Sequence, residues 1–195
     1  PNAVWGSAYD DVYVADEGGN ISHFDGVAWT AQFQVYITFL RDLDGSGSAL
    51  VFAVGESGRI FRNEGSGWSA VTSGTQTDLY GVSVVSSSLA YAVGDNGVVR
   101  QYDGTSWGTM SSPSADNLYD VKAFGPQDIW VIGESDLYHF DGTQWVAFAQ
   151  THSLEYTWGI WGTSSDDMYF GANGTLYHFD GAQFTEVAVS GLSTN

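Results

Sequence analysis

The sequence predicts an all-β protein built from five copies of one four-stranded unit. Residues 79–107 show the unit most clearly: two short apolar strands, a Gly94-Asp-Asn-Gly97 turn, a third strand, an Asp103-Gly104 turn and a closing Trp107. Asp-Gly between apolar runs is a strong hairpin signal, because both turn positions need a positive φ. The closing aromatic recurs at residues 29, 68, 107, 145 and 184, with spacings of 39, 39, 38 and 39 residues. A four-stranded repeat of this length is typical of a propeller blade, so we expect a five-bladed β-propeller with four antiparallel strands per blade.

The repeats account for the whole sequence. Their boundaries are 1–33, 34–75, 76–115, 116–154 and 155–195, which together form a single domain. In the third repeat we expect strands at 79–85, 89–93, 98–102 and around 107–110. The residues after Gly191 lie where a next first strand would begin, so residues 192–195 are expected to approach residues 1–5 and close the ring. The alternative is that the five repeats belong to a longer array.

Composition excludes several functions. The chain has 23 acidic and 5 basic residues, which gives a formal net charge of −18. Such a charge repels nucleic acid and anionic membranes and attracts cations or basic partners. No apolar run is long enough for a membrane span. The chain has no cysteine, which excludes disulfides, catalytic thiols and thiolate metal sites, and fits a secreted or cell-surface location.

The repeats also carry a family resemblance. The pattern Trp-Gly, Asp-Asp-Val-Tyr, and then Ile-x-His-Phe-Asp-Gly-x-x-Trp resembles propeller repeats of secreted and surface proteins from myxobacteria and related bacteria. The Asp-Gly-x-x-Trp turn is distantly similar to the Asp-box of sialidase-type propellers, although its spacing differs by one residue and the Ser is missing. The five-repeat plan is similar to that of the lectin tachylectin-2. The resemblance implies an exported propeller module and no particular reaction.

One segment suggests a calcium site. The link between the first two strands of repeat two carries about four extra residues and has Asp42, Asp44 and Ser46 at alternate positions, followed by Gly47. Calcium takes several oxygen ligands from short flexible loops, and Gly permits the sharp turn. A later acidic ligand is missing, because Leu50 and Ala53 stand where it would be. The alternative is an ordinary Asp/Gly/Ser-rich surface hairpin.

A ring of carboxylates is the candidate ligand site. The turn between the second and third strands carries an acidic residue in four repeats, and tyrosines near the starts of first strands should approach the same face. The candidate residues are Glu17, Glu56, Asp95, Glu134, Tyr80, Tyr119 and Tyr156. Carboxylates beside aromatic rings could bind a sugar or a cationic partner, whereas the alternative is simple turn chemistry.

Two other recurring features are expected to be structural. His23, His139 and His178 recur two residues before the turn Asp, with Arg62 and Gln101 in the same slot elsewhere. A His-x-Asp pair shares one strand face and could resemble a metal or acid/base pair. Its recurrence favours a structural bond repeated with the fold. The closing aromatics are likewise expected to pack between blades.

Catalysis is not expected. Propeller glycosidases place unlike carboxylates around the central channel. The first-strand positions expected there are Ala3, Gly81, Ser83, Asp120, Lys122, Thr157 and Gly159, of which only one is acidic. No nucleophile elbow, phosphate loop or zinc-type histidine pair occurs.

The functional hypothesis is therefore a non-catalytic, lectin-like module that binds a carbohydrate and is a monomer as a closed ring. The alternative is a protein-interaction or scaffold module without a small-molecule site. A glycoside hydrolase is a distant third hypothesis, in which turnover would depend on the Asp120 carboxylate. Calcium is the only cofactor that the sequence suggests.

Overall fold

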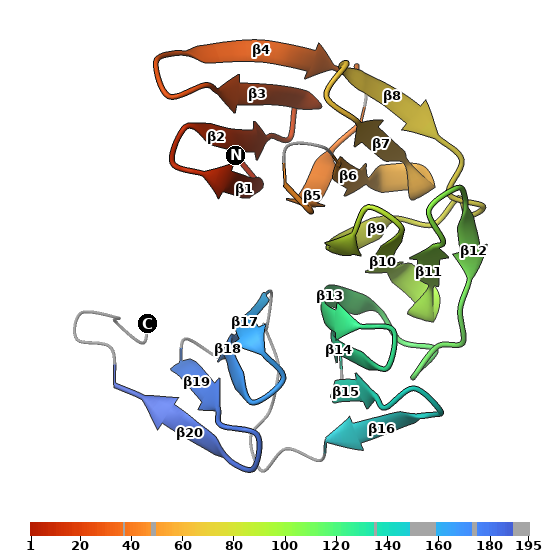
Figure 1. Ribbon diagram of the computed structural model, residues 1–195. Coiled ribbons are helices and arrows are strands. Elements are labelled where there is room, and N and C mark those ends of the chain that lie inside the picture. Colours follow the sequence, from red (N-terminus) through yellow and green to blue (C-terminus); the bar gives the residue numbers. More distant parts are fainter. Residues whose placement is uncertain (37, 48–49, 135, 149–158, 173–174, 189–195) are drawn as a thin grey trace.

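The protein consists of five four-stranded antiparallel sheets arranged as blades around a common axis (Figure 1). The computed structural model describes residues 1–36, 38–47, 50–134, 136–148, 159–172 and 175–188. In each sheet the strands lie side by side in sequence order, from the innermost to the outermost. This confirms the predicted all-β propeller with five blades. No helix in the described ranges has the length and apolar character needed to cross a membrane.

The strands follow the predicted repeats closely. Sheet 1 contains β1 (Ala3–Ala8), β2 (Asp11–Ala15), β3 (Asn20–Phe24) and β4 (Trp29–Gln34). Sheet 2 contains β5 (Leu40–Gly45), β6 (Val51–Gly55), β7 (Ile60–Asn63) and β8 (Trp68–Val71). Sheet 3 contains β9 (Leu79–Ser86), β10 (Leu89–Gly94), β11 (Val99–Tyr102) and β12 (Trp107–Thr109). Sheet 4 contains β13 (Leu118–Gly125), β14 (Asp128–Gly133), β15 (Leu137–Phe140) and β16 (Trp145–Phe148). Sheet 5 contains β17 (Ile160–Ser164), β18 (Asp167–Ala172), β19 (Thr175–Phe179) and β20 (Phe184–Val187).

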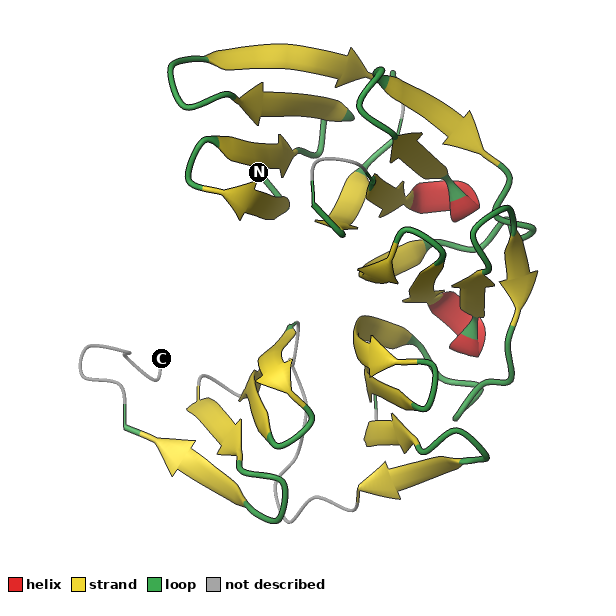
Figure 2. Ribbon diagram, in the orientation of Figure 1, coloured by secondary structure: helices red, strands yellow, loops and turns green. Residues whose placement is uncertain are grey.

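Two single turns of 3₁₀ helix are the only helices in the described chain, and Figure 2 shows them in red. They are η1 (Glu56–Gly58) and η2 (Asp95–Gly97), and each joins the second strand of its sheet to the third. Their central residues, Ser57 and Asn96, have φ values of 57° and 56°. Asn tolerates this left-handed conformation well, which is why a Gly/Asp/Asn-rich turn fits here.

The hydrophobic core is divided among the boundaries between sheets. Each of four apolar clusters joins the side chains of two successive sheets. Phe52 of sheet 2, for example, lies edge-on to Tyr102 and Trp107 of sheet 3, with ring centroids 5.0 and 5.1 Å apart. Edge-to-face aromatic pairs add to the energy of apolar burial. The closing Trp107 therefore packs between blades, as predicted.

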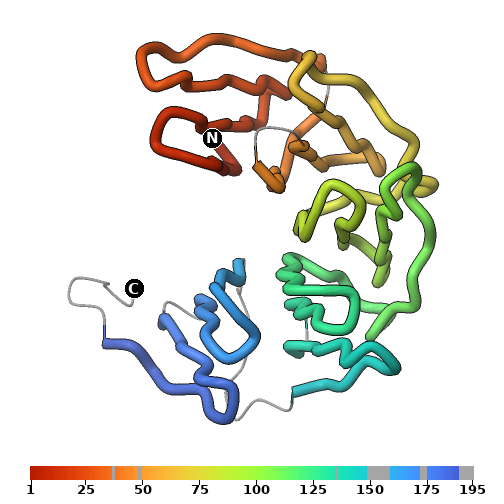
Figure 3. The backbone as a smooth tube through the Cα atoms, viewed as in Figure 1, coloured from red at the N-terminus to blue at the C-terminus, as the bar shows by residue number. Residues whose placement is uncertain are grey.

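The five sheets do not close into a ring. Figure 3 shows an opening between the described parts of sheet 1 and sheet 5. Val4 on the innermost strand of sheet 1 is 68% exposed, and Trp161 on that of sheet 5 is 60% exposed. The expected closed ring is therefore wrong for the described chain. The predicted approach of residues 192–195 to the first strand lies outside the described residues.

Candidate functional site

The first candidate site lies on the face that carries the links between sheets, which we name the connecting face. The η1 and η2 turns lie on this face because each donates to the loop that enters the next sheet. The Ser57 N–H donates to the Asp78 carboxylate at 2.8 Å, and the Asn96 N–H donates to the Asn117 side-chain oxygen at 3.1 Å. These equivalent bonds fix the turns against the starts of the next inner strands.

A cleft of about 660 Å³ opens on the connecting face. Its lining residues are Pro1, Asn2, Arg41, Tyr80, Asn117 and Tyr119. The Tyr80 and Tyr119 rings lie with centroids 6.0 Å apart at an angle of 42°. The Arg41 guanidinium lies 5.9 Å from the Tyr80 ring centroid and donates to the Glu56 carboxylate at 2.9 Å. The cleft thus combines two aromatic rings with a cation that is paired to a carboxylate at its border.

The tyrosine hydroxyls of the cleft stay protonated. Burial, together with a hydrogen bond to Asp95, raises the pKa of Tyr80. Burial and the nearby charge of Glu134 raise the pKa of Tyr119, which is also hydrogen-bonded to Asn117. Both phenols therefore present neutral rings and polar tips, a combination common at protein interfaces.

Two of the seven candidate ligand residues, Tyr80 and Tyr119, line the cleft. Three more interact with its lining residues: Glu56 with Arg41, Asp95 with Tyr80 and Glu134 with Tyr119. Glu17 lies instead in the exposed turn of sheet 1, where Asp16 accepts from the Gly18 and Asn20 N–H groups at 2.8 and 2.9 Å. Tyr156 lies outside the described residues.

Sequence reasoning missed four of the six cleft residues, and Arg41 is the one among them with a charged side chain. It precedes Asp42 in β5, at the position that tyrosines occupy in β9 and β13. Aligning the first strands of the repeats, instead of treating residues 41–48 as a loop, would have found it.

The second candidate site is the central channel, where a cavity of about 460 Å³ is lined by the inner strands of all five sheets. Its polar residues are Asp42, Asp44, Ser83, Asp120 and Lys122, and its apolar residues include Trp5 and Trp161. The expectation of a single acidic channel residue is therefore wrong. The error arose because Asp42 and Asp44 were assigned to an inserted loop, whereas both lie in strand β5. Only Ser46 lies in the turn, where its N–H donates to the Leu50 carbonyl at 3.0 Å. Thr157 lies outside the described residues.

The channel carboxylates bond to backbone groups of the neighbouring sheet. Asp42 accepts from the Val82 N–H at 2.9 Å, and Asp44 accepts from the Val84 N–H at 2.7 Å. Asp120 accepts from the Ile160 N–H at 2.8 Å. Each bond crosses one boundary between blades, so these carboxylates have a structural role.

The surroundings of the same carboxyl groups disfavour their ionised form. Burial is the largest influence on all three, and it raises the pKa of Asp42 and of Asp44 and raises that of Asp120 to about 7. The charge of Asp120 raises the pKa of Asp42 further. Lys122 acts in the opposite direction, because its positive charge favours the ionised form of Asp44 and Asp120.

Within the described ranges, no group of three or more His, Asp or Glu side chains is arranged to hold a metal ion. The calcium hypothesis for Asp42, Asp44 and Ser46 stays a prediction. One oxygen each of Asp42 and Asp44 is already bonded across to sheet 3.

The recurring histidines form structural bonds within their sheets. His23, His139 and His178 each bond the Asp that opens the second strand of the same sheet, at 2.7, 2.9 and 2.8 Å. Each imidazole also stacks on an aromatic ring of that strand, with centroids 4.2 to 4.5 Å apart. The partner is therefore not the turn Asp two residues later. That Asp accepts hydrogen bonds from its own turn: in sheet 4 the Thr143 hydroxyl and the Thr143 and Gln144 N–H groups donate to Asp141 and lower its pKa to about 2.

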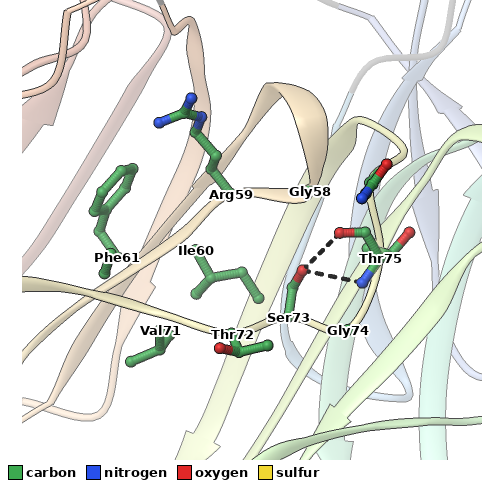
Figure 4. Close-up of a pocket in the computed structure, with 11 residues that line it drawn as sticks. Gly58, Arg59, Ile60, Phe61, Val71, Thr72, Ser73, Gly74 and Thr75 are labelled. Carbon is green, nitrogen blue, oxygen red and sulfur yellow. Dashed lines mark hydrogen bonds between the residues drawn. The ribbon is translucent and has the colours of Figure 1, made fainter.

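A third hollow, of about 500 Å³, lies where sheet 2 leads into sheet 3 (Figure 4). The Ser73 hydroxyl there donates to the Thr75 carbonyl and accepts from the Thr75 N–H, both at 3.2 Å. Ser73 also accepts, through its carbonyl, from the buried guanidinium of Arg100 at 2.7 Å. These bonds hold the link in place, and we assign the hollow no ligand.

Comparison with known proteins establishes the fold. No model of a known protein family matches the chain, and no curated protein sequence matches it. Solved β-propeller structures do match, each over 95% of this chain. They include YCF48 bound to D1 peptide (14% identity, TM-score 0.65), a mitotic checkpoint complex (11%, 0.76) and YCF48 from Cyanidioschyzon merolae (12%, 0.69). The chain spans 65%, 64% and 71% of the lengths of those chains. The resemblance to myxobacterial repeats, to the Asp-box and to tachylectin-2 stays a prediction.

Proposed function

We propose that the protein is a non-catalytic interaction module that binds a basic segment of a partner protein in the cleft of the connecting face. The observation that carries the proposal is the convergence of Tyr80, Tyr119 and Arg41 in one concave site bordered by carboxylates. Tyr and Arg are enriched at protein interfaces, and they dominate binding energy when they lie in a pocket.

The negative charge of the chain favours a basic partner. The net charge of −18 attracts basic segments over long range and raises their association rate. At short range the neutral tyrosine rings offer faces for Lys or Arg side chains. Glu56, Asp95 and Glu134 offer negative charge beside them. Support for a peptide ligand also comes from the solved structures, because one similar propeller is described as bound to a peptide and another as a member of a complex.

The test is selection from a random peptide-display library with the full chain as bait. We expect peptides enriched in Lys and Arg, with affinity that falls as salt rises. Tyr80→Ala and Tyr119→Ala are each expected to weaken binding about tenfold or more, a loss of about 1.4 kcal/mol. Tyr9→Ala is the matched control, because Tyr9 is an exposed tyrosine outside the cleft. Selection of peptides without basic enrichment, or equal losses in all three variants, would contradict the proposal.

A carbohydrate is the second candidate ligand, because two rings beside carboxylates could stack on and hydrogen-bond a sugar. A glycan array with the same variants separates the two ligands. Sugar binding that is lost in Tyr80→Ala, together with no peptide selection, would favour the lectin hypothesis. Running the array with calcium and with a chelator also tests Asp42 and Asp44 as metal ligands. A secreted or cell-surface location is part of the same proposal and rests on the acidic, cysteine-free composition.

A further inference from the structure

The four boundaries between sheets follow one packing rule. We name the side of a sheet that contacts the preceding sheet its leading face, and the other side its trailing face. The trailing face presents an aromatic residue from the second strand, and this residue is Tyr13, Phe52, Tyr91 or Trp130 in sheets 1 to 4. The leading face of the following sheet covers it with aliphatic and aromatic side chains. On the inner strand of that leading face, Leu43, Val82 and Val121 are each only 3% exposed.

Sheet 1 breaks this rule on its leading face. Val4 occupies the position of Leu43, Val82 and Val121, as the strand registers show, yet it is 68% exposed. Trp29 occupies the position of Trp107 and is 53% exposed, whereas Trp107 is 6% exposed. The other apolar members of this face, which are only partly buried, are Val12, Val14 and Phe24. An apolar face of this kind costs free energy when it is left in water.

Sheet 5 breaks the rule on its trailing face. Tyr169 occupies the position of the aromatic residues that are buried in sheets 1 to 4, and it is only partly buried. Leu176, which is equivalent to the buried Ile60 and Val99, is also only partly buried. Trp161 stands beside them on the inner strand and is exposed. The two faces border the same opening in Figure 3.

We propose that a further four-stranded blade of the same construction occupies the opening between sheets 5 and 1. The two unpartnered faces are of opposite kind, one leading and one trailing, which is what a blade inserted between them requires. Its trailing face would place an aromatic residue against Val4 and Trp29. Its leading face would place aliphatic residues against Tyr169 and Leu176. The four existing boundaries supply the pattern that the new contacts continue.

A polar contact supports the same occupant. The Val82 and Ile160 N–H groups each donate to an Asp carboxylate of the preceding sheet. The equivalent Leu43 and Val121 N–H groups donate instead to Asp42 and Asp120 of their own strands. Val4 is the equivalent residue in sheet 1, and an Asp or Asn side chain at the matching position of the new blade would accept from its N–H in the manner of Val82 and Ile160.

The chain itself provides the first test. In residues 1–195, the β1 amides should exchange hydrogen at least tenfold faster than those of β9 and β13. Acrylamide should quench a fluorescence component that is lost in Trp161→Phe. Both results should be independent of protein concentration. Protected β1 amides and a shielded Trp161 in the monomer would show that the five blades close on themselves. Protection that rises with a dimer population would identify a second copy as the occupant. Either result overturns the proposal.

A designed chain provides the second test. A copy of residues 78–117 is joined ahead of Pro1, because residue 118 is equivalent to residue 1 in the repeat. We expect β1 exchange to slow at least tenfold. In the matched control the appended copy carries Tyr91→Ser, which removes its trailing aromatic ring, and the protection should be lost. An appended blade that folds but leaves β1 unprotected, or a control that protects equally well, would overturn the proposal.

Discussion

Sheet 3 and sheet 1 have the same strand plan but very different surroundings. Sheet 3 packs between sheets 2 and 4, so both of its faces are covered, and residues such as Tyr91 and Val82 are buried. Sheet 1 has only one covered face, and its Val4 and Trp29 are exposed. Apolar side chains at equivalent positions therefore stabilise sheet 3 by burial and form an exposed apolar surface on sheet 1. What a repeat contributes depends on its neighbours, as in other repeat architectures.

The largest expected effect tests this comparison directly. Trp107→Ala should lower the free energy of unfolding by about 3–5 kcal/mol, because it opens a cavity against Phe52 and Tyr102. Trp29→Ala, at the equivalent position of sheet 1, should cost less than about 1 kcal/mol, because the ring is half exposed. Urea unfolding of both variants measures the difference. Equal losses would show that the face of sheet 1 is covered in solution.

A smaller effect concerns the channel and its pH dependence. Asp120 has a folded pKa of about 7, above its unfolded value of about 3.9, so the folded state binds the extra proton. The stability that this carboxyl contributes is therefore present below about pH 4 and is lost as the pH rises through 7, with a slope of at most about 1.4 kcal/mol per pH unit.

Asp120→Asn should reduce the slope of urea unfolding measured at pH 4 to 8 without abolishing it, because burial also raises the pKa values of Asp42 and Asp44. Lys122→Met should extend the slope to higher pH, because Lys122 is the cation that favours the ionised form. A variant Asp120→Asn with the wild-type pH profile would contradict the placement of this carboxylate.

The smallest expected effect concerns two different side chains at equivalent positions of the third strand. His139→Ala should cost about 1 kcal/mol, because the imidazole stacks on Trp130 at 4.2 Å and bonds Asp128 at 2.9 Å. Gln101→Ala, in the same slot of sheet 3, should cost about 0.5 kcal/mol, because the amide makes one long bond to the Tyr91 hydroxyl at 3.3 Å. Thermal unfolding of both variants checks the order, and a larger loss in Gln101→Ala would reverse it.

The sequence predicted whatever depends on short-range pattern. The strands expected at 79–85 and 89–93 correspond to β9 and β10 to within one residue, because turn residues bound them on both sides. The sequence placed Glu56 and Asp95 on the same face as Tyr80, because the turn after the second strand and the start of the first strand lie on the same face in every repeat.

What the sequence did not predict depends on long-range packing. Asp42 and Asp44 resembled a loop because strand β5 contains two carboxylates and two glycines follow nearby, and only the contacts to Val82 and Val84 show why a strand accepts them. The closed ring also failed as an expectation, because the repeat length gives the number of blades and does not give the angle between them.

The bonds between inner strands have a mechanical consequence. Every boundary in the described chain has at least one tie from a side chain to the backbone of the adjoining blade. The donor–acceptor pairs are Asn2 to Leu40, Val82 to Asp42, Val84 to Asp44, Ala123 to Ser83 and Ile160 to Asp120. Each tie spans about one repeat and none reaches further. A chain pulled from its two ends should therefore unfold one blade at a time, beginning with sheets 1 and 5. The boundary between sheets 2 and 3 has two such bonds and should separate last.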